Sequence, residues 1–286
     1  MPGLLERVRE QCADIAAGAR HVRVDLDAAT GIETGPPPSL DPEKHYLEGS
    51  RDDVVAYLLT LDAINFGSGW FPTLRKRPGC SGYYTIAWAL AEQFRANGPW
   101  TPDDLRHLDA VAIAGVLGQD PGHELMALYA RALRNLGEFL EENQIPLEGS
   151  AEALVELLAR RMPMFDDVGF WKRAQITAND LTLAGLAEFD DIDRLTIFAD
   201  NLVPHVLRMD GVLIYDEELA RHIDSGELLP PGPAEREIRA CAVHACESIA
   251  VELGVPPRDL DVMLWNRGQG ERYKARPRHR TRTIYY

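Results

Sequence analysis

Apolar residues at helical spacing, followed by a stop signal, constrain the fold of this chain more than any other feature of its sequence. Residues 51–64 begin with charged side chains and continue as an i, i+3/i+4 stripe. The stripe comprises Val54, Val55, Leu58, Leu61 and Ile64. Residues 233–253 repeat this pattern, and Gly254 follows as a typical helix stop. Both segments predict helices with one buried face.

Three further sites predict helix starts. Thr101-Pro102-Asp103-Asp104 combines a Thr cap, an early proline and acids in the first turn. Asp120-Pro121 predicts a second start, before a long helix that ends near Gln144. Ser150 predicts a third, before a helix that ends near Met162. Most of the chain therefore has helical character.

Strand signals are few. Residues 21–25 alternate and residues 283–286 are β-prone, but neither segment forms a sheet alone. The predicted fold class is therefore all-α. The segment 117–121, which lies between two predicted helices, is similar to a helix-hairpin-helix turn.

We expect a single helical domain over residues 1–286 with two appendages. The Pro- and Gly-rich loop 31–43 separates an N-terminal helical hook from the main body, so residues 1–43 form the hook and its loop. The basic tail 272–286 is expected to dock on the body.

The composition and net charge exclude several classes of protein. With 45% hydrophobic and 26% charged residues, the chain is an ordinary globular one. Acidic residues outnumber Lys and Arg by 45 to 30, for a net charge of −15, and such a surface repels a polynucleotide backbone. A local basic patch can still hold a single phosphate.

The sequence contains no targeting, membrane or metal-binding pattern. Charges interrupt the N-terminal segment every few residues, unlike a signal or transit peptide, and no apolar run is long enough to span a membrane. We therefore expect a cytoplasmic protein with reduced cysteines. The histidines have no HExxH-like spacing, and neither a P-loop nor a dinucleotide fingerprint occurs. We predict neither a metal nor a cofactor.

Glycine and aromatic residues are dense between residues 65 and 84, NFGSGWFPTLRKRPGCSGYY. Gly67 and Gly69 let the backbone approach a ligand closely. The aromatic side chains are Trp70, Phe71, Tyr83 and Tyr84. These rings would stack on a planar base, or alternatively form an aromatic core under a loop.

Two other segments carry charged candidates. In FWKRAQIT (170–177), Lys172 and Arg173 point about 100° apart on a helix and cannot both face inward, so one of them would reach a pocket; alternatively, they form a solvated pair. In TIFADNLVPHVLRM (196–209), Asp200 lies among apolar residues. Pro204 would interrupt the helix and kink the backbone at Asp200. The alternative for Asp200 is a structural ion pair.

The tail, residues 272–286, is basic, whereas the chain as a whole is acidic. Its basic residues are Arg272, Lys274, Arg276, Arg278, His279, Arg280 and Arg282. The closing residues 284–286 are apolar or aromatic and would tie the tail to the body. A docked tail would present Arg280 or Arg282, with His279, to a phosphate; a disordered tail is the alternative.

Taken together and in order, these segments resemble the queuosine salvage protein family, the queuosine 5′-monophosphate N-glycosylases. The matching stretches are His45-Tyr46, LDAINFGSGW (61–70), FWKRAQI (170–176), LTIFADNLVPHVL (195–207), EIRACAVHACE (237–247), VMLWNRG (262–268) and PRHRTRTIYY (277–286). The resemblance covers roughly residues 43–286. It implies an architecture like that of helix-hairpin-helix DNA glycosylases. It also implies hydrolysis of the N-glycosidic bond of queuosine 5′-monophosphate or queuosine, with release of queuine.

The resemblance also implies roles for individual residues. Asp200 would stabilise or attack the oxocarbenium-like ribose, and Lys172 would orient Asp200 and keep it ionised. The implied substrate-binding residues are His45 and Trp70 for the base edge and face, Glu237 and Asp261 for the amine and diol of queuine, Ser68, Phe198, Asn201, His279, Arg280 and Arg282. The chain has Gly67-Ser68 where family members often have Cys-Phe, and Asn201 where many have Tyr, so the base contacts differ.

Three other functions share some of these features. A base-excision glycosylase would have the same fold and Asp200 but needs a broad basic face. A non-catalytic queuine-binding or transfer module would keep the aromatic and acidic residues without a buried aspartate beneath the sugar. A scaffold protein is the third alternative. The expected partner is a small-molecule substrate, with no polynucleotide and no membrane, and the oligomeric state stays open.

Overall fold

The computed structural model describes residues 2–286 and divides into two compact units that interleave along the chain. Unit 1 comprises Met1–Pro38, Val168–Lys172 and Asp191–Thr283, of which the structure describes all but the first residue. Unit 2 comprises Ser39–Asp167, Arg173–Asp190 and Ile284–Tyr286. The expectation of a single domain over residues 1–286 stays a prediction.

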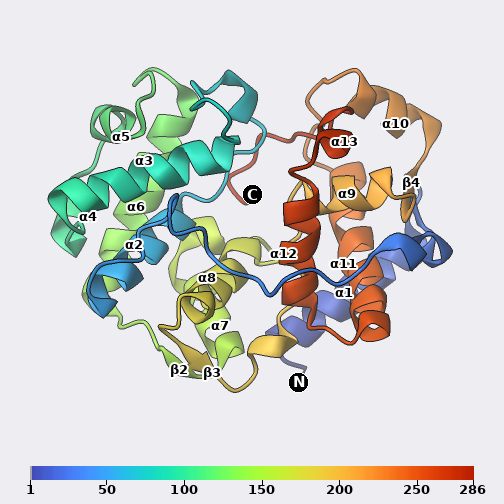
Figure 1. The fold of residues 1–286 in the computed structure, drawn as a ribbon, viewed down its shortest axis with the longest axis horizontal. Helices are drawn as coiled ribbons and strands as arrows, with labels where there is room; N and C mark the ends of the chain where they lie inside the picture. The colour runs from blue at the N-terminus through green and yellow to red at the C-terminus, as the bar shows by residue number, and fades with distance from the viewer. Residues whose placement is uncertain (1) are drawn as a thin grey trace. The chain divides into compact units, whose positions relative to one another are not determined.

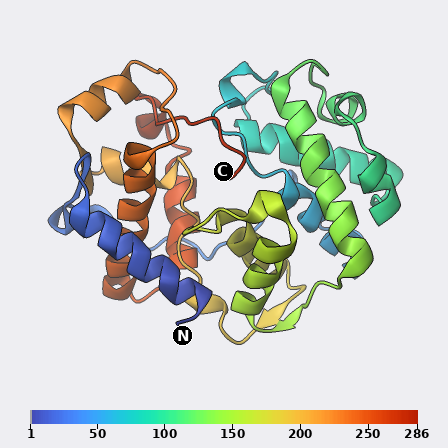
Figure 2. The ribbon, with the colours of Figure 1, turned by 180° about the vertical axis from the view of Figure 1, so that it is seen from behind.

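Unit 1 is built around one long helix. It contains α1 (Leu4–Gly18), β1 (Val22–Val24), α9 (Val203–Met209), β4 (Leu213–Tyr215), α10 (Glu217–Asp224), α11 (Pro233–Leu253), α12 (Pro257–Arg267) and α13 (Glu271–Lys274), with 3-10 turns at Leu26–Gly31 and Ile192–Arg194. Helix α11 packs against α1, α9 and α12 (Figures 1 and 2). Its predicted bounds are confirmed: Pro233 occupies the first turn, and Gly254 ends the helix in the left-handed conformation.

The alternating segment near the N-terminus does form a strand. Strand β1 pairs antiparallel with β4, with Val22 opposite Tyr215 and Val24 opposite Leu213. This partner is supplied from far along the chain, so the alternation of residues 21–25 could not reveal it. The β-prone residues 283–286 form no strand.

Unit 2 is a bundle of short helices around α6. It contains α2 (Arg51–Ala63), α3 (Gly82–Asn97), α4 (Pro102–His107), α5 (Ala110–Leu117), α6 (Glu124–Glu142), β2 (Glu148–Gly149), α7 (Ala151–Arg161), β3 (Glu188–Phe189), α8 (Lys172–Leu183) from Arg173 onward, and 3-10 turns at Phe71–Thr73 and Pro163–Phe165. Helix α6 packs against α2, α4 and α5 (Figure 1). Strands β2 and β3 form a short parallel pair.

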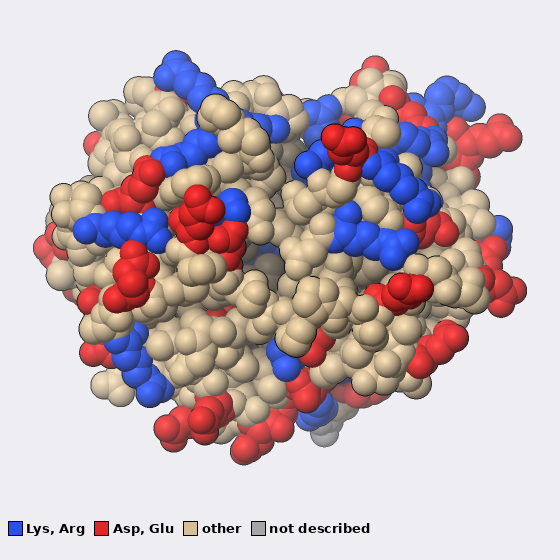
Figure 3. Space-filling model, viewed as in Figure 1, with Lys and Arg blue, Asp and Glu red and all other residues tan. Residues whose placement is uncertain are grey.

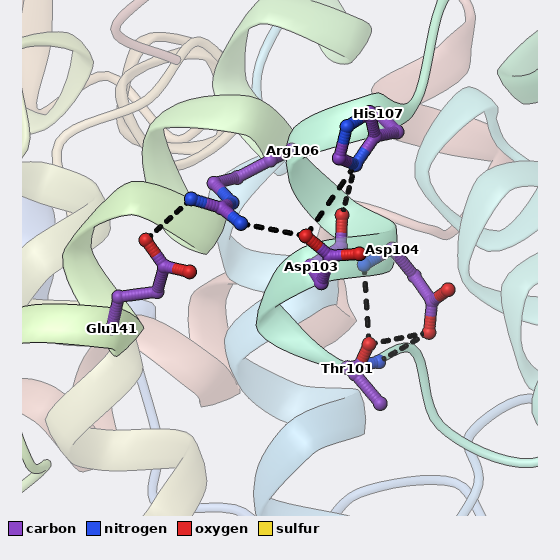
Figure 4. Close-up of polar contacts among 6 residues, drawn as sticks. All are labelled: Thr101, Asp103, Asp104, Arg106, His107 and Glu141. Atoms are coloured by element: carbon purple, nitrogen blue, oxygen red, sulfur yellow. Dashed lines mark hydrogen bonds and ion pairs between the residues drawn. The ribbon is translucent and has the colours of Figure 1, made fainter.

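The cap at Thr101 fixes α4 as the sequence predicts (Figure 4). The Thr101 side chain accepts the Asp104 N–H, and the Asp104 carboxylate accepts the Thr101 N–H at 2.9 Å, which is a complete capping box. From the same helix, Arg106 bridges Asp103 and Glu141, each at 2.6 Å, and so ties α4 to α6 (Figure 4).

The predicted start at Asp120-Pro121 is wrong. These residues form a turn in which the Asp120 carboxylate accepts the Gly122 N–H at 2.8 Å. Helix α6 begins three residues later at Glu124, where the His123 ring accepts the Leu125 N–H at 3.2 Å. An aspartate before a proline can cap a helix or stabilise a turn, and Asp120 stabilises a turn. The start at Ser150 is confirmed, because its side chain accepts the Ala153 N–H at 3.1 Å.

The mostly helical content confirms the predicted all-α class, since the strands are two or three residues long. The likeness to helix-hairpin-helix glycosylases stays a prediction. Cys12, Cys80, Cys241 and Cys246 are free thiols. Among residues 2–286, no helix combines the length and the apolar character that a membrane crossing requires.

Candidate active site

The segment that carries Asp200 is an irregular loop whose backbone is fixed residue by residue within unit 1. The Phe198 N–H donates to the Asp261 carboxylate at 2.8 Å, and the Ala199 carbonyl accepts a 2.9 Å bond from Nε of Arg239. Arg239 is itself buried and lies 3.9 Å from the centre of the Phe170 ring. The segment therefore holds Asp200 on a rigid support.

The predicted kink at Asp200 is wrong. The segment before Asp200 is not helical; α9 begins at Val203, so Pro204 lies in the first turn, where a missing N–H costs nothing. Asp200 precedes the helix and its Oδ1 accepts the N–H groups of Leu202 at 2.7 Å and Val203 at 3.1 Å. Within residues 2–286 its carboxylate makes no other hydrogen bond, so Oδ2 is available to a ligand.

The Asp200 carboxylate is half-buried and its charge acts on Arg278. Burial lowers the pKa of the Arg278 guanidinium, while the nearby Asp200 opposes that effect. Arg278 is absent from the set of residues that the sequence predicted for the site. A single arginine within a basic tail gives no local signal that separates it from its neighbours.

Lys172 and Arg173 are both buried, so the alternative of a solvated pair is wrong, and so is the expectation that the two cannot both face inward. Lys172 belongs to unit 1, the unit that contains Asp200, whereas Arg173 belongs to unit 2. Arg173 donates to the carbonyl oxygens of Ala63 at 2.5 Å and Ile284 at 2.9 Å, and also to that of Met164. Burial lowers the pKa of Arg173 to about 9. These contacts make Arg173 a structural residue.

The rings of Phe66 and Phe165 hold the Arg173 guanidinium, at 4.7 and 4.5 Å from their centres. Each ring presents its negative face to the cation, which partly replaces the water that the guanidinium has lost. Three backbone carbonyls and two rings thus help to accommodate a charged side chain with 1% exposure, and the charges of Asp167 and Asp62 also favour its protonated form.

The loop at Gly67 and Ser68 is shaped by close backbone contacts within unit 2. Gly67 has a φ of 97°, and a Cβ there would lie 2.6 Å from Leu125 Cδ1, so only glycine fits. The N–H groups of Gly67 and Ser68 donate to the Tyr286 oxygen at 2.9 and 3.4 Å. The Ser68 Oγ is buried and has no hydrogen-bond partner within residues 2–286.

The aromatic residues of this region lie mostly in the core of unit 2. Trp70 is buried, and its indole N–H donates to Glu124 Oε2 at 2.8 Å. His45 is also buried; its Nδ1 contacts the Asp41 carbonyl oxygen at 2.8 Å and its Nε2 contacts the Tyr83 hydroxyl at 3.0 Å. Burial lowers the pKa of His45, which favours the neutral ring. Stacking on a ligand by these residues stays a prediction.

Glu237 and Asp261, predicted to accept donors from the base, have partners in the backbone of unit 1. Oε2 of Glu237 accepts the N–H groups of Arg20 at 3.0 Å and His21 at 2.7 Å. Asp261 holds the Phe198 N–H. Both carboxylates therefore shape unit 1, and their contact with a ligand stays a prediction.

The tail up to Thr283 is held in unit 1 by hydrogen bonds. The Arg280 guanidinium donates to the Gly226 carbonyl, and the Arg280 carbonyl accepts the Leu229 N–H at 2.8 Å. The Asn201 side chain donates to the His279 carbonyl at 3.1 Å. Arg282 is exposed. Burial lowers the pKa of His279 to about 3, so its ring would meet a phosphate as a neutral hydrogen-bonding group.

The described residues hold no metal-binding cluster. Within residues 2–286, no group of three or more His, Cys, Asp or Glu side chains is placed to hold a metal ion.

His205 is a second buried histidine of unit 1, and we expect its neutral ring to make the stability depend on pH. Its Nε2 donates to the Tyr273 carbonyl at 2.8 Å, and its Nδ1 has no hydrogen-bond partner within residues 2–286. A protonated ring would carry an N–H at Nδ1 with no acceptor. Burial accordingly lowers the pKa of His205 from 6.5 to about 4.

We predict that the free energy of unfolding falls as the pH is lowered from 6.5 to about 4. In this window the unfolded chain binds a proton at His205 that the folded chain does not, so the neutral ring contributes stability above pH 6.5 and loses it on acidification. A shift of this size is worth up to about 3 kcal/mol. Urea unfolding at several pH values measures it.

His205→Gln keeps a donor for the Tyr273 carbonyl and should make this pH dependence shallower, while the part contributed by the buried His279 and His45 remains. The exposed His107, replaced in the same way, is the control and should leave the dependence as in the wild type. If the free energy of unfolding falls by the same amount on acidification in the wild type and in His205→Gln, His205 does not contribute to the pH dependence.

Comparison with known proteins relates the chain to one family. The family profile described as queuosine salvage protein matches residues 44–286. A protein named queuosine 5′-phosphate N-glycosylase/hydrolase from Sphaerobacter thermophilus is 33% identical over 306 residues, covering 94% of each chain. Proteins of the same name from Bos taurus and Dictyostelium discoideum are 35% and 32% identical, covering 100% and 80% of this chain and 100% and 77% of their own.

Proposed function

Because the chain belongs to the queuosine salvage protein family, we propose that it hydrolyses the N-glycosidic bond of queuosine 5′-monophosphate or queuosine and releases queuine. One observation supports Asp200 as the catalytic residue. Asp200 has one carboxylate oxygen fixed by two backbone amides and a second oxygen that no group within residues 2–286 occupies.

The fixed carboxylate suits the charge that develops in this reaction. As the bond from the ribose to the base breaks, the electron pair leaves with the base and positive charge builds on the ribose carbon and ring oxygen. Oδ2 of Asp200 stabilises that charge or attacks the carbon. Water supplies the hydroxyl of the ribose product, and its proton ends on the nitrogen of the released base. The amides of Leu202 and Val203 hold Oδ1, so little reorganisation is needed during the reaction.

The leaving group increases the demand on Asp200. Queuine is a 7-deazapurine and has no N7 to protonate as it departs, so more of the barrier falls to stabilisation of the ribose. Lys172, buried in the same unit, is proposed to orient the charged groups of the reacting site. We assign Phe198 and Asn201, which flank the Asp200 loop, to substrate contacts. Glu237 and Asp261 would accept the cationic amine and the diol of queuine.

His45, Ser68 and Trp70, the residues that the resemblance assigns to the substrate, lie in unit 2, and their contact with the base stays a prediction. Ser68 offers a buried hydroxyl that no group within residues 2–286 satisfies, which is typical of a ligand contact. Both ring nitrogens of the neutral His45 already have partners, so a bond to the base edge would replace one of them. Trp70 is assigned to the face of the base.

The charge distribution favours a nucleotide over a polynucleotide. On the face drawn in Figure 3, acidic and basic side chains are interspersed, with several basic ones close together near α13. A duplex binder needs a continuous basic face, whereas one phosphate needs a single local patch. We therefore propose that the substrate is a free nucleotide or nucleoside in the cytoplasm, without binding to nucleic acid.

The substrate range tests this proposal. We would incubate the purified protein with queuosine 5′-monophosphate, with queuosine and with intact tRNA that contains queuosine, and separate free queuine by chromatography. We expect release from the monomeric substrates and none from the tRNA. Release from tRNA would support a base-excision enzyme instead, and tight binding of the nucleotide without release would support a binding module.

A further inference from the structure

We infer that Arg278 binds the 5′-phosphate of the substrate and makes the enzyme favour the nucleotide over the nucleoside. The inference rests on the proposed function, which places the ribose at Asp200. It assigns to one residue a task that the sequence pattern distributed over Arg280, Arg282 and His279.

The first observation is that the hydrogen-bonding capacity of Arg278 is unused. A guanidinium has five N–H donors, and in Arg278 none of them forms a hydrogen bond or an ion pair within residues 2–286. The side chain is nevertheless half-buried. A cation withdrawn from water without acceptors is costly unless an anion arrives to replace the lost hydration.

The second observation is that the other basic groups of the tail are less suited to hold a phosphate. Arg280 already donates to the Gly226 carbonyl, and Arg276 pairs with Asp224. Arg282 is exposed, so a phosphate bound there would be largely hydrated. His279 is fully buried and neutral at physiological pH. Arg278 is both partly shielded from water and uncommitted.

The third observation is that the backbone fixes Arg278 relative to Asp200. The residue after Arg278 accepts a 3.1 Å hydrogen bond from Asn201, which directly follows Asp200 in the chain. The next carbonyl, that of Arg280, accepts the Leu229 N–H at 2.8 Å. The charges of Arg278 and Asp200 interact, although the two form no ion pair. Arg278 and Asp200 are thus separate groups on two segments that the Asn201–His279 hydrogen bond joins, and we place the two ends of a ribose 5-phosphate at them.

The chemistry of Asp200 and Arg278 suits the two ends of a ribose 5-phosphate. A carboxylate suits the ribose carbon, where positive charge develops, and a guanidinium suits a phosphate, which it binds through two parallel hydrogen bonds. Binding energy gained at the phosphate, away from the bond that breaks, positions the ribose over Asp200. The nucleoside has no phosphate and cannot use this contact.

The test compares Arg278→Met and Arg278→Lys with the wild type on queuosine 5′-monophosphate and on queuosine. For Arg278→Met we expect kcat/KM for the nucleotide to fall roughly 10- to 100-fold. The fall for the nucleoside should be at least tenfold smaller. Arg278→Lys should recover part of the loss, because an ammonium keeps the charge but not the bidentate geometry. The control is Lys274→Met, an exposed basic residue of the same tail, which should match the wild type on both substrates.

A second measurement is independent of turnover. Calorimetric titration with ribose 5-phosphate should show binding to the wild type and to Lys274→Met, and strong weakening in Arg278→Met. If the wild type hydrolyses neither substrate, the proposed function fails, and this titration still decides the role of Arg278.

Two results would overturn the inference. Equal losses for nucleotide and nucleoside, with thermal unfolding midpoints like the wild type, would mean that Arg278 acts on Asp200 rather than on a phosphate. Unchanged affinity of Arg278→Met for ribose 5-phosphate would mean that the phosphate binds elsewhere. If Arg278→Met does not fold, the affinity of Arg278→Lys for ribose 5-phosphate is compared with the wild type instead.

Discussion

Replacing Asp200 by asparagine should reduce kcat on the order of 100-fold or more while leaving binding of the substrate largely intact. Asparagine keeps an oxygen that accepts the N–H groups of Leu202 and Val203, so the loop and the start of α9 should be preserved. What disappears is the negative charge that stabilises the ribose cation. Steady-state kinetics and a calorimetric titration with the nucleotide measure the two effects separately.

The matched control is Asp193→Asn, which removes an exposed carboxylate paired with Arg258 in the same unit. It should retain the wild-type kcat. An Asp200→Asn variant with wild-type turnover and an unchanged unfolding midpoint would remove Asp200 from the mechanism.

Replacing Lys172 by alanine should lower kcat by roughly 10- to 100-fold, with a smaller change in KM. Lys172 is 5% exposed, and a buried ammonium is retained in proteins where acidic or reacting groups need it. Lys172→Met keeps the aliphatic volume and removes only the charge, so it should lose as much activity as Lys172→Ala. Added ethylammonium should restore part of the activity of Lys172→Ala.

Lys274→Ala removes the exposed lysine of α13 and serves as the control for charge loss. If Lys172→Met keeps wild-type kcat while Lys172→Ala loses it, the side chain contributes packing alone, and Lys172 has no part in the chemistry.

Local sequence signals predicted the helices well where cap and stop residues are unambiguous. Pro233 and Gly254 set the two ends of α11 because a proline without N–H suits a first turn and a glycine suits the left-handed end. The same logic failed at Pro204. A proline inside an apolar segment predicts a kinked helix, but the residues before Pro204 form a loop. Asp261 and Arg239, which come from distant segments, form hydrogen bonds with the backbone of that loop and hold it in place of a helix.

The candidate site was predicted in part, for a similar reason. Asp200 stands out as a carboxylate among apolar residues, and its place at an irregular, rigid loop agrees with a functional role. Glu237 also stands out, but its partners are backbone amides at Arg20 and His21 that the sequence could not bring near it. Arg278 could not be separated from the other tail arginines, because only the contacts show which guanidinium is engaged and which is not.

The central claim is that the chain hydrolyses a nucleotide at Asp200. Its most direct measurement is the product balance of a multiple-turnover reaction with queuosine 5′-monophosphate, in which queuine and ribose 5-phosphate are both quantified. We expect equal amounts of the two products, in molar excess over the wild-type enzyme, and loss of both products with Asp200→Asn. Nucleotide recovered intact after prolonged incubation with the folded wild type would contradict it.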